Sequence, residues 1–573
     1  MLKRIFPILD WLPNYKTSYL SGDVTAGLTV GIMLIPQGMA YAMIAGLPPV
    51  FGLYAALLPQ VVYAIMGTSR QLAVGPVAMD SLLVASGLGA LALSGIEEYI
   101  SMAIFLALFM GTIQFALGLL RMGFLVNYLS KPVISGFTSA AAIIIGLSQL
   151  KHLLGTEIPS SSHIHTLIQN TIETLGTTNL ITLGIGIIAI ILIKVLRKVH
   201  KQIPGGLIAV MLGIGFVYFL NLESFDVKIV GSIPEGLPGF NIPTLEWSRV
   251  SELFPIAMTL ALIAFMEAIS VAKAVEERHD DYEVNANKEL IALGSSNIIG
   301  SLFQSYPTTG GFSRTAVNDQ AGAKTGLAAV ISALIVGLTL LFLTPLFYYL
   351  PNAILAAVVM VAVFGLIDIN YPKQLFKYRK DEFYLLLFTF TITLFVGIKE
   401  GILLGVLVSL LLLVYRTSKP HIAILGKISG TDYFRNIQRF EEAEIDNDLL
   451  ILRFDAQIYF GNKDYFKQAV LKEIKSKGEG LIWVILNAEA INYIDSSAAH
   501  MLKQLLKELN ENGITLVIAG ATGPTRDILF SSRLVDDIGK DNLYVSTLEA
   551  YRSIKHETTI EPVHKQISLQ NKM

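Results

Sequence analysis

The feature that most constrains this chain is a run from Val24 to Ser69 that contains no charged residue. A helix that crosses the hydrocarbon core of a bilayer needs about 20 consecutive apolar residues. The run is therefore long enough for two membrane-spanning helices. We expect the chain to fold back between them at Gly46–Pro49, where a glycine and two prolines cluster.

Further runs that are poor in charge continue as far as Tyr415. They cover residues 71–96, 99–120, 132–150, 174–193, 202–221, 253–266, 290–313, 325–367, 383–398 and 401–415. The run 325–367 is again long enough for two helices. With the short piece after Gly311 counted as a half-helix, the pattern predicts a polytopic α-helical membrane protein with about 14 transmembrane segments, and a count of about 12 or 13 is the alternative.

Composition excludes several classes of function. Only 15% of the residues are charged, whereas a soluble protein carries about a quarter. The net charge of −2 gives no reason to expect nucleic acid as a partner. The chain has no cysteine, which excludes disulfides, thiol catalysis and thiolate metal sites. It has no HExxH or P-loop motif, and its nine histidines are scattered, so we expect no cofactor, no metal site and no enzymatic activity.

Basic residues predict the orientation in the membrane, because basic loops stay in the cytoplasm. Four basic clusters lie at Lys3–Lys16, Lys194–Lys201, Lys373–Lys380 and Arg416–Lys419. With an even number of segments they share one side, so we expect both termini in the cytoplasm. The predicted outward loops hold no Asn-x-Ser/Thr glycosylation acceptor, which favours a bacterial plasma membrane.

After Lys419 the composition changes to that of a small α/β domain. Strand-like runs at 449–454, 481–486 and 514–519 alternate with helical patterns such as 498–510. This alternation predicts a mostly parallel sheet with crossover helices. The predicted organisation is a cytoplasmic N-terminal segment (1–20), a transmembrane transporter domain (21–418), a linker (419–447), the α/β domain (448–555) and a polar tail (556–573).

Two short segments in corresponding places of the membrane region begin with Gly and Pro. The first follows Ala73–Pro76 and the second follows Pro307–Gly311. Many secondary transporters are built from two inverted repeats, and interrupted segments in matching positions mark a binding site at the bilayer midplane. We therefore predict a seven-plus-seven inverted repeat. The alternative is that both segments are ordinary loops and kinks.

Such a site favours anions, because a half-helix that begins in the membrane directs its N–H groups and positive dipole end into the cavity. Ser313 and Arg314 lie at the start of the second half-helix. An arginine offers a fork of donors that matches an oxyanion, and a charge inside the membrane is a functional candidate. The alternatives for Arg314 are that it reaches the membrane surface or pairs structurally with Asp319.

Glu267 is the candidate for ion coupling. It lies in the apolar segment 253–275 that opens the second half, which places it near the midplane. We interpret it as an acid that exchanges H⁺ during the cycle, with Na⁺ as the alternative ion. Lys273 is six residues away and is not at helical pairing distance. A structural acid that bonds to neighbouring helices is the other interpretation.

Three motifs in this order resemble the sulfate permease (SulP) family of anion transporters: Ile35–Ala42 (IPQGMAYA), Val74–Ala78 (VGPVA) and Gly310–Thr315 (GGFSRT). The C-terminal domain resembles the STAS domain that members of this family usually carry, with Ile494–Ala498 (IDSSA) before its helix. The resemblance covers nearly the whole chain. It is specific for the family and weak for the substrate.

The resemblance implies a core bundle that holds the anion and moves against a gate bundle in an elevator-like cycle, and it implies a homodimer. Gln37 and Tyr41, on a broken first helix, would line the site. The backbone amides near Val77 and Ala78 would bind the anion from one side, and Ser313 with Arg314 from the other. Taken without the family, Gln37 and Tyr41 are equally explained as structural polar residues of membrane helices.

In the STAS domain, Ser497 matches the loop that is phosphorylated in related anti-sigma antagonists, so we expect a regulatory site and a regulatory protein partner there. The alternative is that Asp495 and Ser496 only cap the following helix. For the whole chain we expect secondary active transport of a small inorganic oxyanion, sulfate first and bicarbonate next, coupled to H⁺ or Na⁺. The alternatives are an uncoupled exchanger or channel for chloride or nitrate, a dicarboxylate carrier, a nucleobase permease and a membrane sensor that acts through its STAS domain.

Overall fold

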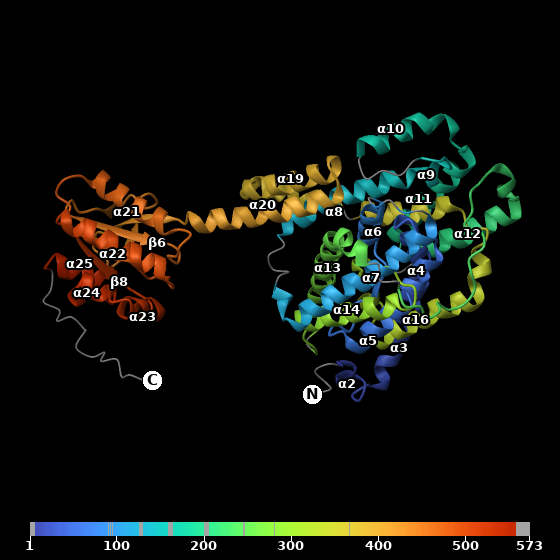
Figure 1. The fold of residues 1–573 in the computed structure, drawn as a ribbon, viewed down its shortest axis with the longest axis horizontal. Helices are drawn as coiled ribbons and strands as arrows, with labels where there is room; N and C mark the ends of the chain where they lie inside the picture. The colour runs from blue at the N-terminus through green and yellow to red at the C-terminus, as the bar shows by residue number, and fades with distance from the viewer. Residues whose placement is uncertain are drawn as a thin grey trace. The chain divides into compact units, whose positions relative to one another are not determined.

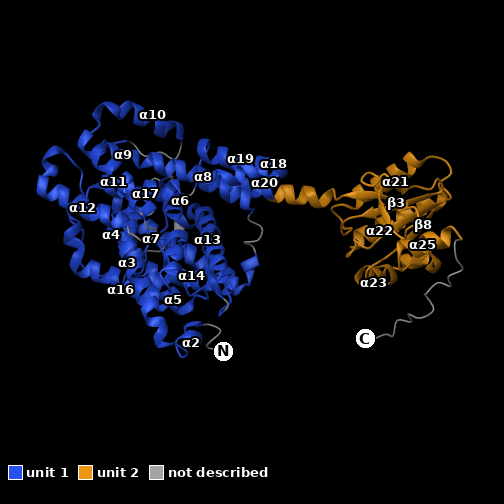
Figure 2. Cartoon of the chain, turned by 180° about the vertical axis from the view of Figure 1, so that it is seen from behind, with its two compact units in different colours: residues 1–409 blue, residues 410–573 orange. Residues whose placement is uncertain are grey.

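The computed structural model describes residues 6–89, 91, 93, 95–124, 130–158, 164–199, 205–243, 247–279, 281–365 and 367–556. The chain forms two compact units, Met1–Ser409 and Leu410–Met573, which are coloured separately in Figure 2. Lys3, Arg4 and Lys201, which contribute to the predicted orientation, lie outside the described residues. So does the predicted polar tail, apart from His556.

The first unit is helical and apolar (Figure 1). Six helical stretches in the described part of the chain are long and apolar enough to cross a membrane: α3 (Thr17–Ile44), α7 (Ile96–Leu119), α8 (Lys131–Ser148) with α9 (Leu150–Leu154), α13 (Trp247–Glu276), α16 (Leu327–Leu338) with the turns up to Phe347, and α20 (Ile398–Ser418). The last of them, α20, continues past Ser409 into the second unit. Shorter apolar helices are α4 (Val50–Ala55) with α5 (Leu58–Met66), α6 (Ala78–Gly89), α11 (Leu180–Val199), α12 (Gly205–Leu220) and α17 (Asn352–Phe364). The remaining helices of this unit are α2 (Ile8–Trp11), α10 (Ile164–Thr174), α14 (Ala286–Ser301), α15 (Phe312–Gln320), α18 (Asn370–Tyr378) and α19 (Lys380–Phe395).

The first long helix is not broken, so this part of the expectation was wrong. Helix α3 runs from Thr17 to Ile44 with Pro36 inside it. A proline removes one backbone donor, but in apolar surroundings the remaining backbone groups are satisfied best within a helix, so membrane helices tolerate the residue. The predicted turn at Gly46–Pro49 is confirmed, since Gly46 has a φ of +79° and α4 begins at Val50.

Helix α3 approaches its neighbours most closely at Gly38. A Cβ atom added to Gly52 of α4 would overlap the carbonyl oxygen of Gly38. A Cβ added to Gly38 would lie 3.7 Å from Cγ of Pro76. Small residues allow such close backbone contact between membrane helices. This packing holds the middle of α3 beside the residues that lead into α6.

Two short strands connect the halves of this unit. Strand β1 (Val74–Gly75) pairs antiparallel with β2 (Thr309–Gly310), with Val74 opposite Gly310 and Gly75 opposite Thr309. Helix α6 follows β1 and helix α15 follows β2. Both half-helices expected from the Gly- and Pro-containing motifs are therefore present. The strand pairing that brings their beginnings together was not predicted.

Two buried acids connect loops to helices in this unit through hydrogen bonds. Asp23 on α3 and Glu289 on α14 are both fully buried. The donors to Asp23 are Lys324 N, Thr325 N, Thr325 Oγ1 and Tyr15 OH, and those to Glu289 are Tyr63 OH, Thr68 N, Thr68 Oγ1 and Ser69 N. Several donors compensate for the burial of each carboxylate, so these two acids are structural.

The second unit is an α/β domain with a seven-stranded sheet. Its order is β4-β3-β6-β7-β8-β9, and β5 pairs with β3. The strands are β3 (Ile422–Ile428), β4 (Phe434–Asn436), β5 (Ala443–Glu444), β6 (Leu449–Phe454), β7 (Trp483–Asn487), β8 (Thr515–Ala519) and β9 (Leu543–Tyr544). Strands β6 to β9 are parallel, as predicted. The helices are α21 (Lys463–Lys477), α22 (Ser496–Glu511), α23 (Gly523–Ser531), α24 (Leu534–Ile538) and α25 (Thr547–Ile554).

The segment 419–447, predicted as a linker, instead contributes to the sheet. Strand β3 pairs antiparallel with β6 from Ile422 to Leu425, and β4 and β5 pair with the rest of β3. Strands β4 and β5 have three and two residues, which is too short to show a periodic pattern. The sequence that follows β3 therefore resembles a loop. The folded domain thus begins close to the end of α20 at Ser418.

Candidate functional site

The candidate site lies where α6 and α15 begin. The first turn of a helix has N–H groups without intrahelical acceptors, and its dipole favours an anion. The β1–β2 pair holds the two beginnings next to each other, and the Ala73 N–H donates to Thr315 Oγ1 at 3.0 Å. Asn318 donates to the carbonyl of Gln71 at 2.8 Å. These hydrogen bonds and the strand pair hold helix α15 against the segment that leads into α6.

Arg314 connects the two half-helices and keeps part of its hydrogen-bonding capacity unused. Its side chain is 2% exposed, and Nη1 donates to the carbonyl of Pro76 at 2.7 Å. Within the described part of the chain, Nε and Nη2 have no hydrogen-bond partner. Burial of a charged group without partners is costly, so these two donors indicate a place for an anionic acceptor.

Both alternative interpretations of Arg314 are wrong. Its burial shows that it does not extend to the surface. Asp319 is engaged elsewhere, since its carboxylate is 3.2 Å from Nη1 of Arg278 and 2.7 Å from Nε2 of His279. No acid neutralises Arg314 by a direct ion pair among the described residues.

Gly75 and Gly311 lie close to the guanidinium of Arg314 and have no side chain that would press against it. A Cβ atom at Gly311 would lie 2.9 Å from Nη2, and one at Gly75 would lie 3.5 Å from the same atom. A side chain at Gly311 would displace the guanidinium, because real Cβ contacts are longer than this. The glycines of both motifs thus keep open the face of Arg314 that carries the unpaired donor.

Tyr41 and Glu267 lie in the same neighbourhood as Arg314. Tyr41 on α3 is buried, and Glu267 on α13 is partly buried, with its Oε2 atom enclosed and unpartnered. Tyr41 interacts electrostatically with Arg314 and with Glu267, and Glu267 interacts with Arg314. Sequence reasoning therefore selected three side chains that the fold brings together from three helices.

No direct interaction with Arg314 is seen for the other predicted residues among those that the structure describes. Gln37 is half-buried, and its Oε1 atom is enclosed without a partner. Val77 and Ala78 form the junction into α6, where the Ser81 N–H donates to the carbonyl of Val77 at 3.0 Å. Ser313 is exposed on the first turn of α15. Ser313 therefore differs from Arg314, its neighbour in the sequence, which is buried.

Sequence reasoning missed Asp80 and Tyr306. Asp80, in the first turn of α6, is fully buried, and neither carboxylate oxygen has a partner within the described residues. It interacts electrostatically with Glu267 and with Tyr306, whose hydroxyl lies 3.0 Å from Ser81 Oγ. Asp80 is the only charged residue in the run 71–96. An acid inside a membrane segment is a functional candidate by default, and that signal was available in the sequence.

In the second unit, Ser497 lies in the first turn of α22 and is exposed. Asp495 is the N-cap, since its side chain accepts from Ala498 N at 2.8 Å. Its other oxygen accepts from Phe460 N at 2.8 Å. The capping role considered for Asp495 is confirmed, and Ser497 remains accessible beside it.

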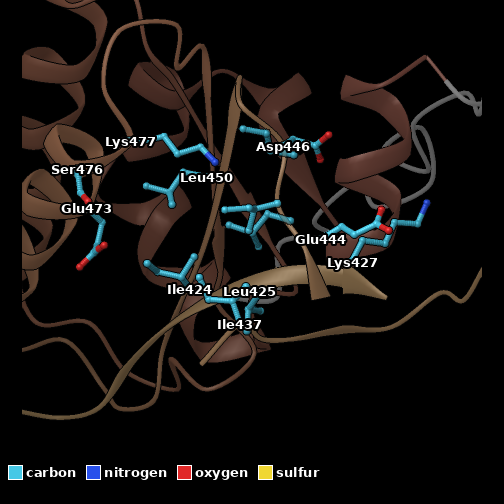
Figure 3. A pocket seen from close by; sticks show the side chains of 13 residues that line it. Ile424, Leu425, Lys427, Ile437, Glu444, Asp446, Leu450, Glu473, Ser476 and Lys477 are labelled. Carbon is cyan, nitrogen blue, oxygen red and sulfur yellow. The ribbon is translucent and has the colours of Figure 1, made fainter. Parts of the chain in front are cut away.

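A cavity of about 190 Å³ lies in the second unit between the sheet and α21 (Figure 3). Its floor is apolar and includes Ile424 and Leu450, while charged residues of both signs stand around it. Lys427 lies beside Glu444, and Lys477 and Asp446 also line the cavity. This mixture gives no preference for an inorganic anion, so the candidate anion site is the one around Arg314.

Comparison with known proteins identifies the family of both units. The sequence profile of the Sulfate permease family matches residues 20–389, and that of the STAS domain matches residues 441–550. "Sulfate transporter 4.1, chloroplastic" from Arabidopsis thaliana is 40% identical over 567 residues, which cover 96% of this chain and 82% of that protein. "High affinity sulfate transporter 2" from Stylosanthes hamata is 34% identical over 578 residues, with 96% and 86% covered.

One solved structure matches nearly the whole chain, and another matches about two thirds of it. The structure of SLC26A9 superposes with a TM-score of 0.88 at 25% identity, covering 97% of this chain and 93% of that one. The transmembrane domain of the cyanobacterial bicarbonate transporter BicA gives a TM-score of 0.60 at 24% identity over 69% of this chain and 98% of that one. This chain is a multi-pass membrane protein that belongs to the sulfate permease family of anion transporters and carries a C-terminal STAS domain.

Proposed function

We propose that the protein is a secondary active transporter that carries sulfate, with bicarbonate as the next candidate, and couples its uptake to H⁺. The observation that supports this most is Arg314, a buried guanidinium with two unpaired donors between two helix N-termini. Planar donor forks and helix N-termini both bind tetrahedral and planar oxyanions. The sulfate transporters among the relatives favour sulfate, and the likeness to the bicarbonate transporter adds the second candidate.

The proposed transport cycle is an elevator-type movement of a core bundle against a gate bundle. We assign fourteen segments in two halves of seven, from α3 to α12 and from α13 to α20. In this count α4 and α5 form one segment, α8 and α9 form another, and the short helices α10 and α18 are left out. The matching places of α6 and α15, each third in its half and each preceded by a strand, support the inverted repeat. Because α15 is hydrogen-bonded to the segment that leads into α6, the two half-helices would move together with the anion.

We further propose a homodimer in a bacterial plasma membrane, with both termini in the cytoplasm. The orientation follows from the basic clusters, which an even number of segments places on one side. Cysteines introduced singly into this cysteine-free chain and labelled from outside intact cells would test the orientation. The mass of the purified protein in detergent would test the dimer, and a monomeric mass would contradict it.

The function is tested by uptake of labelled sulfate into vesicles that contain the purified protein. We expect uptake when the outside is more acidic than the inside, and we expect unlabelled sulfate to compete more strongly than bicarbonate. Competition by chloride, nitrate or a dicarboxylate above that by sulfate would identify one of the alternative carriers. Uptake of uracil would identify a nucleobase permease, and the absence of any uptake would favour a sensor.

For the STAS domain we propose a regulatory role at Ser497, with a protein partner. A phosphate on an exposed first-turn serine would interact favourably with the N-terminus of α22. We expect mass spectrometry of protein from native membranes to find phosphorylated Ser497 under some growth conditions. An unmodified Ser497 under every condition would leave Asp495 with its capping role alone.

A further inference from the structure

The starting point is the group of charged side chains at the proposed anion site. Arg314 supplies one positive charge, while Asp80 and Glu267 each supply one negative charge when ionised. Asp80 interacts electrostatically with Glu267, and Glu267 interacts with Arg314. The residues come from α6, α13 and α15, so the fold brings them together from both halves of the membrane unit.

Asp80 differs from the structural acids of this unit. Asp23 and Glu289 are equally buried, and each accepts hydrogen bonds from several donors. Asp80 is fully buried, and both of its oxygens are without a partner in the described part of the chain. A buried carboxylate in that state is stabilised by a proton or by another cation.

Among the described residues, no basic side chain pairs with Asp80 to neutralise it. Helix α6 packs against α3, α7, α8 and α13. On α13 the facing titratable group is Glu267, and Tyr306 faces it from the segment before β2. The charged residues of α7 and α8 are Glu97, Glu98 and Lys131, which lie in the first turns of those helices. On α3, the acid Asp23 is bonded to other groups, and Tyr41 interacts with Arg314 and Glu267.

The balance of charge limits how an anion can enter. With both acids ionised the site has one net negative charge before any anion arrives, and a divalent anion would make it three. Like charges at close range oppose binding strongly where the dielectric constant is low. With both acids protonated, Arg314 faces the anion without competition. The loaded site then has one net negative charge.

We propose that Asp80 is a second proton-carrying acid of the anion site, so that one divalent anion is carried with two protons, one on Asp80 and one on Glu267. Each proton is taken up by a carboxylate on the side where the anion binds and is released on the other side, so no other reactant is needed. The inference rests on the proposed H⁺-coupled transport of sulfate. It adds an acid that the sequence motifs do not include and fixes the number of protons.

The test measures how strongly a pH difference concentrates sulfate in vesicles that contain the full-length protein. The membrane voltage is clamped at zero with potassium and valinomycin. At equilibrium, one pH unit concentrates the anion about 100-fold if two protons accompany it and about tenfold if one does, because each coupled proton contributes a factor of ten per unit. We expect about 100-fold for the wild type and about tenfold for Asp80→Asn.

Controls separate coupling from folding. Asp80→Glu keeps the acid, and we expect it to restore the wild-type dependence on the pH difference. Asp281→Asn removes an exposed acid that pairs with Arg70 and should leave the dependence unchanged. Where Asp80→Asn does not reconstitute, Asp80→Ser replaces it. Equilibrium exchange of sulfate without a gradient confirms that each variant is active.

Several results would overturn the inference. A wild-type protein that concentrates sulfate only about tenfold per pH unit carries one proton, whatever the variants do. An unchanged dependence in Asp80→Asn would show that Asp80 carries none. Accumulation driven by a Na⁺ gradient at equal pH, and lost in Asp80→Asn, would assign a sodium ion to Asp80 instead. No driven accumulation in the wild type would contradict the proposed function itself.

Discussion

Replacing Arg314 with alanine is expected to weaken sulfate binding by roughly tenfold or more. Nε and Nη2 of Arg314 are buried donors without a partner, and an anion that accepts from them gains charge-assisted hydrogen bonds. Hydrogen bonds to charged groups contribute about 1.5–3 kcal/mol, and about 1.4 kcal/mol corresponds to a factor of ten in affinity. The measurement is the rise in melting temperature of purified protein as sulfate is added, since a bound ligand stabilises the folded state by mass action.

The control for this prediction is Arg278→Ala. Arg278 is an exposed arginine near Asp319, away from the unpaired donors of Arg314, so its loss removes a positive charge without touching the site. Arg314→Lys should give an intermediate affinity, because a lysine keeps the charge but lacks the fork of donors. Arg314 also donates to the carbonyl of Pro76, so the melting temperature without sulfate must be compared first. Wild-type sulfate affinity in a folded Arg314→Ala protein would show that the anion binds elsewhere.

The sequence predicted the half-helices because their chemistry is local. Glycine and proline interrupt the helical pattern at Ala73–Pro76 and at Pro307–Gly311, and in the structure α6 and α15 begin just after these motifs. The pairing of Val74 with Gly310 could not be predicted in the same way. It joins residues more than 200 positions apart, and strands of two residues carry no periodic signal.

Sequence reasoning predicted the site residues that stand out in the sequence. It missed those whose role depends on the direction of the side chain in the fold. Arg314 and Glu267 are charges in otherwise apolar surroundings, which a sequence displays directly. Asp80 displays the same signal, but the sequence does not say whether it bonds to a neighbouring segment, as Asp23 does, or stays unpaired. The exposure of Ser313 likewise depends on the rotation of α15 about its axis.

Replacing Glu267 with glutamine is expected to remove one of the two coupled protons while leaving exchange of the anion intact. Glutamine keeps the shape and polarity of the side chain but does not release a proton at physiological pH. Glu267 interacts with both Arg314 and Asp80, so its charge changes the attraction of the site for an anion. Loss of its proton should lower the accumulation of sulfate by about tenfold for each unit of pH difference. The measurement is uptake into vesicles with an imposed pH gradient or an imposed Na⁺ gradient.

The matched control is Glu276→Gln on the same helix. Glu276 lies 2.7 Å from Lys273 and accepts from the N–H of Val284, so it has partners that Glu267 Oε2 lacks. Its replacement should affect stability and leave the response to the pH gradient unchanged. A Glu267→Gln protein that still accumulates sulfate as the wild type does would remove Glu267 from the coupling mechanism and leave it as a structural acid. Accumulation that follows Na⁺ in the wild type and is lost in this variant would keep Glu267 as the coupling residue and change the ion it binds.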